Sequence, residues 1–383
     1  MRQSYKQLPG RRVFLSAMLM FIYQPVSDAF TLQQAEHHAL QADPLVESYR
    51  AQARSYSESS VSEGTLPDPR LRLGAVNLPV DSFDLKQEQM TQMVVGIKQD
   101  FPRGDSRQYR QQQTELLSRS ASAQAEDARR RVISEVRQTY LNLYYEIASI
   151  KIVEESKQLF SKLVDVTEST YATGRGNQQD VIQAELELAK LDDRLTQTRA
   201  MAEGYRAELA QWIGDMAWQP VDNDFPVIPD MPADVDLNEV IPAHPIIRAQ
   251  TSRIDASRKM TEIASQDYKP GWSASLDYGF RSGNNPDGTE RTDFVTALVS
   301  LDIPLFTSDR QDRSVAANHE KTAAAQFEKD DKLRKLKRSY DKDRFLWKRL
   351  GERNVLYQNN LLATARDNSR ASLSAYQSGV TEF

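Results

Sequence analysis

The feature that most constrains the fold is an internal repetition with a period of about 200 residues. Four pairs of matching landmarks lie between 201 and 205 positions apart, and the segments around them look alike. A nearly constant separation over four landmarks indicates two tandem copies of one structural unit. The matching landmarks are Pro44 and Pro245, Pro69 and Pro270, Pro102 and Pro304, and Tyr171 and Tyr376.

The sequence is predicted to divide into three segments. Residues 1–29 form a signal peptide, residues 30–230 form the first repeat, and residues 231–383 form the second repeat. Four basic residues precede the apolar run Val13–Tyr23, and Ser27 and Ala29 suit positions −3 and −1 of a cleavage site. An N-terminal membrane anchor is the alternative, but this run is short for a spanning helix. Removal of residues 1–29 changes the net charge from −5 to −8.

Each repeat is predicted to contain a helical stretch, two strands and a very long helix, which makes an α+β fold that is mostly α. The strand segments alternate apolar and polar residues over about ten positions. This alternation suits strands that face lipid on one side, and it equally suits a small soluble sheet with one buried face. Four strands cannot close a barrel, so the membrane interpretation requires several chains. The apolar positions are Leu71, Leu73, Ala75, Met93, Val95, Ile97, Phe101, Trp272, Ala274, Leu276, Tyr278, Phe280, Val295, Ala297, Val299, Leu301 and Ile303.

No proline or glycine occurs between Asp105 and Ala172, which predicts one helix of about 65 residues and roughly 100 Å. Apolar residues follow coiled-coil spacing along it and along residues 178–218. Gly174 and Gly176 between these segments predict a turn into an antiparallel partner. The seam positions are Ile133, Val136, Tyr140, Leu143, Ile147 and Ile150, then Val181, Ala184, Leu188, Leu191, Leu195, Ala202, Tyr205, Leu209 and Trp212.

The second repeat is predicted to copy only the outgoing helix, from Asp309 to Tyr376, with Gly351 as its sole interruption. Gly379 then opens a second turn four residues before the last residue. By internal symmetry a returning helix of about 40 residues would follow, so we expect the second repeat to be C-terminally incomplete. The alternative is a naturally short chain that leaves one helix with an unpaired apolar seam.

The chain carries no recognisable catalytic constellation. Its four histidines do not form a ligand pattern, and no hydrolase, phosphate-binding or dinucleotide-binding motif occurs. Cysteine is absent, which excludes disulfides and thiolate ligands, and Met90 and Met93 suit packing better than metal contact. The net charge and the absence of a basic stripe give no case for nucleic-acid binding. The sequence therefore predicts a protein that is not an enzyme, with no cofactor and no metal site.

Two copies of helix, strand pair and helix hairpin behind a signal peptide resemble the TolC-type outer-membrane factors, the exit ducts of tripartite efflux systems. The resemblance runs from Thr31 to Phe383. Its sharpest parts are the two Tyr-x-x-Gly turns, the junctions FPRGDS and IPLFTSD, and the Asp-Pro and His-Pro pairs near each repeat start. It implies a homotrimer with an α-barrel and a 12-stranded membrane β-barrel. It also implies contact with outer-membrane lipid, a Gram-negative outer-membrane location extending into the periplasm, a periplasmic adaptor protein, and an inner-membrane pump of the RND type.

The resemblance further implies that the two turns form the periplasmic mouth, where the adaptor docks and the pore is gated. A known latch of the family joins a Tyr and an Arg of the second turn to an Asp beyond the first. Tyr376 and Asp180 match the Tyr and the Asp, whereas Thr381 stands at the Arg position, so the ionic part of the latch is in doubt. The implied tip residues are Tyr171, Gly174, Arg175, Gly176, Asp180, Tyr376, Gly379 and Thr381.

The segments beginning at Leu66, Asn77 and Gly174 resemble the factors that serve heavy-metal exporters of the CzcC type. The resemblance therefore implies heavy-metal cations as cargo. A soluble periplasmic coiled-coil adaptor or scaffold is the alternative function, although such adaptors generally carry one hairpin flanked by compact β-domains.

Overall fold

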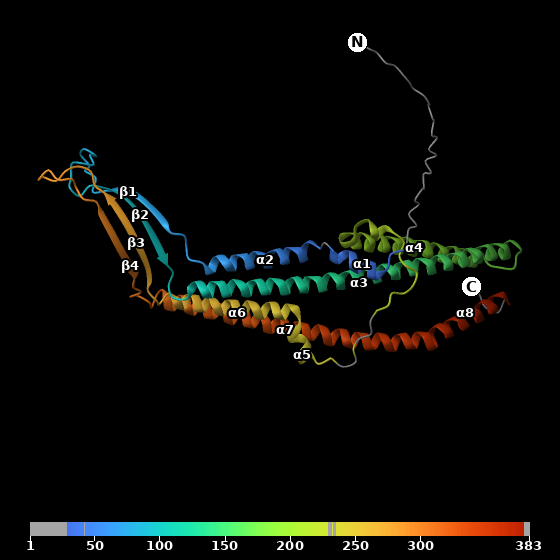
Figure 1. The fold of residues 1–383 in the computed structure, drawn as a ribbon. Coiled ribbons are helices and arrows are strands. Elements are labelled where there is room, and N and C mark those ends of the chain that lie inside the picture. The colour runs from blue at the N-terminus through green and yellow to red at the C-terminus, as the bar shows by residue number, and fades with distance from the viewer. Residues whose placement is uncertain (1–28, 42, 229–231, 233–234, 379–383) are drawn as a thin grey trace, which may run out of the picture.

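The computed structural model describes residues 29–378, except residue 42, residues 229–231 and residues 233–234; the side chains at 376 and 377 are likewise left out. A small sheet stands at one end of a long helical body, and the helices extend away from it side by side (Figure 1). The predicted signal peptide lies outside these residues except for Ala29, as do Gly379 and Thr381. Among the described helices, none combines the length and the apolar character needed to cross a bilayer.

The first repeat follows the predicted order of elements. Helices α1 (Leu32–Gln41) and α2 (Pro44–Gly64) precede strands β1 (Arg70–Val76) and β2 (Gln92–Phe101). The long helix α3 (Ser106–Ala172) has 67 residues, which confirms its predicted extent. The returning segment is α4 (Gln178–Ile213), followed by the 3₁₀ turn η1 (Gly214–Trp218), so the predicted helix changes geometry at Gly214, whose φ is positive.

The second repeat has the same order. It comprises α5 (Leu237–Ala243), α6 (Pro245–Gln266), β3 (Gly271–Phe280), β4 (Phe294–Asp302), α7 (Gln311–Leu356), the π-helical segment η2 (Tyr357–Leu361) and α8 (Leu362–Gln377). The prediction that Gly351 is the sole interruption was wrong, because Gly351 stays inside α7 and the helix changes geometry at η2. A π segment needs neither proline nor glycine, so the composition there gave no signal for it.

The strands form one antiparallel sheet in the order β1-β2-β3-β4. The two repeats meet in its middle, where β2 pairs with β3 and Met93 lies opposite Phe280. At the helical end of this pairing, Phe101 stacks on Trp272 with ring centroids 3.8 Å apart. The strand ranges agree with the predicted ones to within about two residues, because the alternation and the flanking prolines are both local signals.

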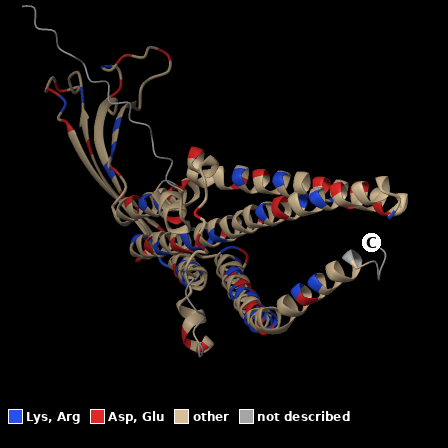
Figure 2. Ribbon diagram, turned by 90° about the vertical axis from the view of Figure 1, so that its right-hand side faces the viewer, with Lys and Arg blue, Asp and Glu red and all other residues tan. Residues whose placement is uncertain are grey.

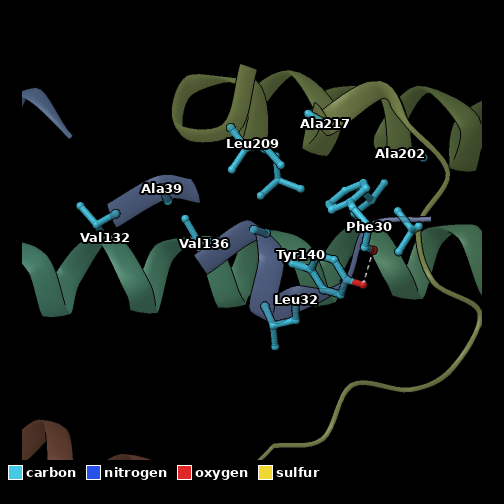
Figure 3. Packing of buried hydrophobic residues seen from close by; sticks show 13 residues of the cluster. Phe30, Leu32, Ala39, Val132, Val136, Tyr140, Ala202, Leu209 and Ala217 are labelled. Carbon is cyan, nitrogen blue, oxygen red and sulfur yellow. Dashed lines mark hydrogen bonds between the residues drawn. The ribbon is translucent and has the colours of Figure 1, made fainter. Parts of the chain in front are cut away.

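The main apolar core lies where α1, α3 and α4 meet (Figure 3), away from the sheet (Figure 1). Val136, Tyr140 and Leu143 of the predicted α3 seam are almost fully buried. Leu209 of α4 is also fully buried. The Tyr140 hydroxyl donates a hydrogen bond of 3.2 Å to the Phe30 carbonyl oxygen. Burial and the nearby Asp222 raise the pKa of Tyr140 to about 12, so this donor keeps its proton at physiological pH.

The core also holds the segment that precedes α1. Phe30 is 2% exposed and meets the Tyr140 ring edge-on at 5.6 Å. Its backbone bridges to the chain beyond η1, with Phe30 N donating to Pro220 O at 2.9 Å and Asp222 N to Phe30 O at 3.2 Å. The start of the first repeat is thereby fixed to the end of its returning helix.

The two repeats begin their second helices with different caps. In α2 the Asp43 carboxylate accepts a bond from Val46 N at 2.9 Å, and in α6 the His244 ring Nδ1 accepts one from Ile246 N at 3.3 Å. Only a neutral imidazole can accept in this way. Burial lowers the pKa of His244, the nearby Asp127 partly offsets this, and Arg130 adds to the lowering.

We expect stability to fall on acidification because of His244. An unfolded histidine gains its proton near pH 6.5, whereas the folded one resists it, so the unfolded state binds more protons below that pH. His244→Asn keeps a capping acceptor and removes the titration. The loss of unfolding free energy between pH 7.5 and 5, measured by urea titration, should be smaller in this variant. Equal losses in the two proteins would contradict the assignment.

Candidate functional site

The turn between α3 and α4 is a glycine-terminated helix end of the Schellman type. Gly174 has a φ of +73° and donates from its N–H to the Tyr171 carbonyl at 2.8 Å, while Arg175 N reaches the Thr170 carbonyl at 3.0 Å. These two bonds satisfy carbonyls that the end of a helix leaves free. The first glycine therefore reverses the chain as the sequence predicts, and Gly176 sits close to the Thr170 side chain.

Gly174→Ala is expected to destabilise the hairpin by roughly 1–2 kcal/mol, because a side chain is disfavoured in the left-handed region. The control is Gly204→Ala within α4, where an added Cβ meets nothing within 4 Å. Alanine in a helix interior should stabilise by roughly 0.5–1 kcal/mol there. Amide hydrogen exchange along α3 and α4 should shift in opposite directions in the two variants, and a shift of the same sign in both would disprove this role of Gly174.

The structure places five of the eight predicted tip residues on or beside this turn. The Tyr171 side chain is 48% exposed, Gly174 and Arg175 are exposed, and Gly176 and Asp180 are partly covered. Arg175 donates from Nε to Thr173 Oγ1 at 3.3 Å. The C-terminal end of α8 reaches the same end of the molecule as the α3–α4 turn (Figures 1 and 2). Tyr376 belongs to α8 by its backbone, whereas Gly379 and Thr381 lie outside the described residues.

At the opposite end, the sheet exposes its apolar face on all four strands, whereas its polar face is sheltered along the two middle strands, β2 and β3. Leu71 and Leu73 of β1 are 69% and 74% exposed, whereas Ser275 and Asp277 of β3 are 9% and 8% exposed. A small soluble sheet with one buried face would show the reverse. Within the described residues no part of the chain covers the apolar face, so this surface suits contact with lipid or another apolar surface.

The sheltered face carries an ion pair that crosses a strand. Arg72 of β1 donates to the Asp277 carboxylate of β3, over β2, at the point where β2 contributes Gly96. A Cβ on Gly96 would overlap that carboxylate, so the pair depends on glycine. Nearer the helices, Asp100 lies 3.0 Å from Lys98 and 3.4 Å from Arg70.

Two arginines tie together the loops beyond the strands. Arg281 donates to Gln89 O at 2.5 Å and Arg291 donates to Glu88 O at 2.9 Å, so the loop after β3 holds the loop after β1. Arg281 also stacks on Phe294 at 4.3 Å. The sequence gives no signal for these contacts, because no local pattern records which backbone carbonyl a distant arginine will reach.

The described residues contain no cluster of three or more His, Cys, Asp or Glu side chains suited to a metal ion. Charged residues of both signs alternate along the helices (Figure 2) and form surface ion pairs, such as Arg199 with Glu154 at 2.7 Å. Such exposed pairs contribute little to stability.

Comparison with known proteins connects this geometry to a family. Residues 36–215 match the family model described as outer membrane efflux protein. No curated protein matches the sequence.

Solved structures share the fold across both repeats. A CusC structure matches with a TM-score of 0.76 at 14% identity, over 92% of this chain and 83% of that one. The outer-membrane channel OprN gives 0.73 at 19% identity, over 91% and 81%. The Campylobacter jejuni outer membrane channel CmeC gives 0.74 at 14% identity, over 91% and 77%. The first repeat therefore matches the outer membrane efflux protein family in sequence, and both repeats share the fold of solved outer-membrane channels.

Proposed function

We propose that three copies of this chain form an outer-membrane exit duct. Substrate would arrive from an inner-membrane pump of the RND type and a periplasmic adaptor. The observation that carries the proposal is the inverted sheet, with its apolar face exposed and its polar face sheltered, at the end of a helical body about 100 Å long. Four strands per chain would give a 12-stranded barrel with its polar face toward the lumen, and the helices would line a tunnel through the periplasm.

The turn at Gly174 would then be the periplasmic mouth, where the adaptor docks. Asp180 lies in the first turn of α4 and would hold the mouth closed through a contact with Tyr376. An ion pair would not contribute, because position 381 carries threonine in place of arginine. Asp180→Ala should raise the uptake of a large antibiotic by cells that make the protein. Asp192→Ala, on the same helix but away from the turn, is the control. Equal uptake in the two variants would count against the latch.

Heavy-metal cations are the proposed cargo. The support is the similarity of the segments beginning at Leu66, Asn77 and Gly174 to factors of heavy-metal exporters. A duct needs no cation site of its own, because the pump and the adaptor select what enters it. Co-expression with a heavy-metal pump and its adaptor should lower cellular metal content, whereas co-expression with a drug pump alone should not. The opposite pattern would reassign the cargo to drugs.

Membrane extraction tests the duct itself. Outer membranes containing the protein should retain it through washes with 1 M salt and alkaline carbonate, and mild detergent should release it. The exposed sheet face predicts this behaviour, since transfer of apolar side chains into lipid is favourable. Release by salt alone would contradict the duct and favour a soluble periplasmic scaffold.

A further inference from the structure

We propose that the helical wall next to the sheet holds a binding pocket for a small zwitterion with an apolar body, such as a dipeptide with apolar side chains. The pocket has a volume of about 400 Å³ and lies among α2, α3, α6 and α7. It adds a second class of cargo to the metal cations proposed above. The inference rests on the proposed duct only where it places the pocket in the lumen.

The row of helices curves around this pocket. Helix α2 packs on α3, α3 on α6 and α6 on α7, whereas α2 and α7 do not contact each other within the described residues. Glu63 of α2 and Asn318 of α7 nevertheless line the same pocket. Side chains from the two outer helices of a row can meet only on its concave side. That side becomes the inner surface if the row forms part of a tunnel wall.

The pocket lies on the same side of the wall as the polar face of the sheet. Arg103, at the junction between β2 and α3, connects the two. Its Nη1 donates to the Asp267 carbonyl at 2.9 Å and lies 3.9 Å from the Asp267 carboxylate, and its Nη2 lies 3.9 Å from the carboxylate of Asp302. Asp267 lines the helical pocket, whereas Asp302 lines a second cavity on the polar face together with Asp100 and Ser273. The polar face would point to the lumen, so the pocket would open there as well.

The pocket offers one unpaired acid and one unpaired base. Glu63 and Arg110 are both exposed, and neither forms an ion pair within the described part of the chain. The third charged residue, Asp267, already lies beside Arg103. A ligand that carries an ammonium and a carboxylate group would satisfy both free charges at once. A metal cation would meet a single free carboxylate near a positive guanidinium, so the pocket does not suit it.

An apolar strip forms the floor of the pocket. Met260, Ile263 and Ala264 of α6 share one helix face by their spacing, and all three line the pocket. Met260 and Ile263 are only partly buried. Contact with an apolar ligand body would remove this surface from water, which favours binding. The ligand therefore combines an apolar body with its two charged groups.

Two buried polar side chains leave acceptors free in the pocket. Thr114 and Asn318 line it and are each 9% exposed. The Thr114 hydroxyl donates to the Arg110 carbonyl at 2.9 Å, and the Asn318 Nδ2 donates to the Ser314 carbonyl at 3.0 Å. Each bond uses a proton, so the side-chain oxygens of Thr114 and Asn318 retain lone pairs for a ligand donor. Such acceptors suit an ammonium or a peptide N–H, which again indicates a peptide-like zwitterion.

Fluorine NMR tests the pocket with three forms of one probe. The probe is a dipeptide of leucine and a fluorinated phenylalanine, used with both ends free, with its amine acetylated, and with its carboxylate amidated. A duct must release what it binds, so we expect weak binding in fast exchange, which broadens the fluorine signal. With the full chain in detergent, each blocked form should bind roughly fivefold more weakly than the free dipeptide. Equal binding of the three forms, or no binding of the free dipeptide, would overturn the proposal.

Two substitutions assign the charged ends of the probe. Arg110→Gln should weaken binding of the free dipeptide roughly fivefold and leave the amidated form unchanged, because that form has no carboxylate. Glu63→Gln should weaken the free dipeptide and leave the acetylated form unchanged. The control is Arg129→Gln, about 28 Å further along α3, which should bind all three forms as the unchanged chain does. If either pocket substitution weakens all three forms equally, the residue acts only on the structure and the assignment fails.

Cysteine protection tests where the pocket opens, because the chain has no cysteine of its own. Ser314 lines the pocket. At a dipeptide concentration of about twice its Kd, the reaction of Ser314→Cys with a small thiol reagent should slow roughly threefold. Ser122→Cys, exposed on α3 outside the pocket, is the control and should react at an unchanged rate. No protection of Ser314→Cys in a trimeric particle would overturn the pocket and leave the duct intact. Protection in a particle that proves monomeric and soluble without detergent would keep the pocket and remove the duct.

Discussion

Replacing Phe30 by alanine is expected to lower the unfolding free energy of the helical body by roughly 3–5 kcal/mol. The ring is 2% exposed and fills the junction of α1, α3 and α4 against Tyr140 (Figure 3). Its loss leaves a cavity that well-packed helices cannot close. The measurement is the urea midpoint of the helical circular dichroism signal in detergent.

Phe83→Ala provides the matched control for that core substitution. Phe83 lies in the loop between β1 and β2 and is 68% exposed, so its truncation should change stability by no more than about 0.5 kcal/mol. Similar effects of the two substitutions would mean that the segment preceding α1 does not anchor the core.

Replacing Gly96 by valine is expected to destabilise the sheet by roughly 2–4 kcal/mol, because it leaves the Asp277 carboxylate buried without Arg72. One oxygen of that carboxylate, Oδ1, already has no hydrogen-bond partner among the described residues. Losing the arginine leaves the other oxygen equally unsatisfied. Thermal unfolding followed by strand-sensitive infrared absorption measures the effect.

Gly74→Val is the control for the strand substitution. Gly74 belongs to β1 and lies on the same face of the sheet as Arg72, but it is exposed and an added Cβ there meets nothing within 4 Å. Valine suits a strand, so this variant should be neutral or slightly more stable. Arg72→Ala should reproduce most of the Gly96→Val loss, and Arg70→Ala, whose side chain is 72% exposed, should not. Equal losses at Gly74 and Gly96 would show that the cross-strand pair is unimportant.

Much of the fold was predictable because its signals are local. The absence of proline and glycine between Asp105 and Ala172 defined α3, and alternation defined each strand. Gly174 marked the turn, and its positive φ explains why glycine stands there. The two repeats could be aligned because prolines recur at matching positions in both.

The remainder depends on contacts that no local pattern encodes. The Arg72–Asp277 pair requires the register of three strands, which becomes visible only in the assembled sheet. Phe30 stands at the edge of the predicted signal peptide, so composition gave no reason to place it in the core. The π segment at Tyr357–Leu361 lies within a sequence that reads as uninterrupted helix. At the proposed periplasmic mouth, the sequence predicted the turn at Gly174. Gly379 and Thr381 of the second predicted turn lie outside the described residues.

The mass of the detergent-extracted particle tests the central claim most directly. Native mass spectrometry of protein taken from outer membranes should show three copies of the chain, since one sheet with an exposed apolar face and two free edges is incomplete alone. A trimer that holds together in mild detergent is the predicted result. A monomer that stays in solution without detergent would contradict an outer-membrane duct.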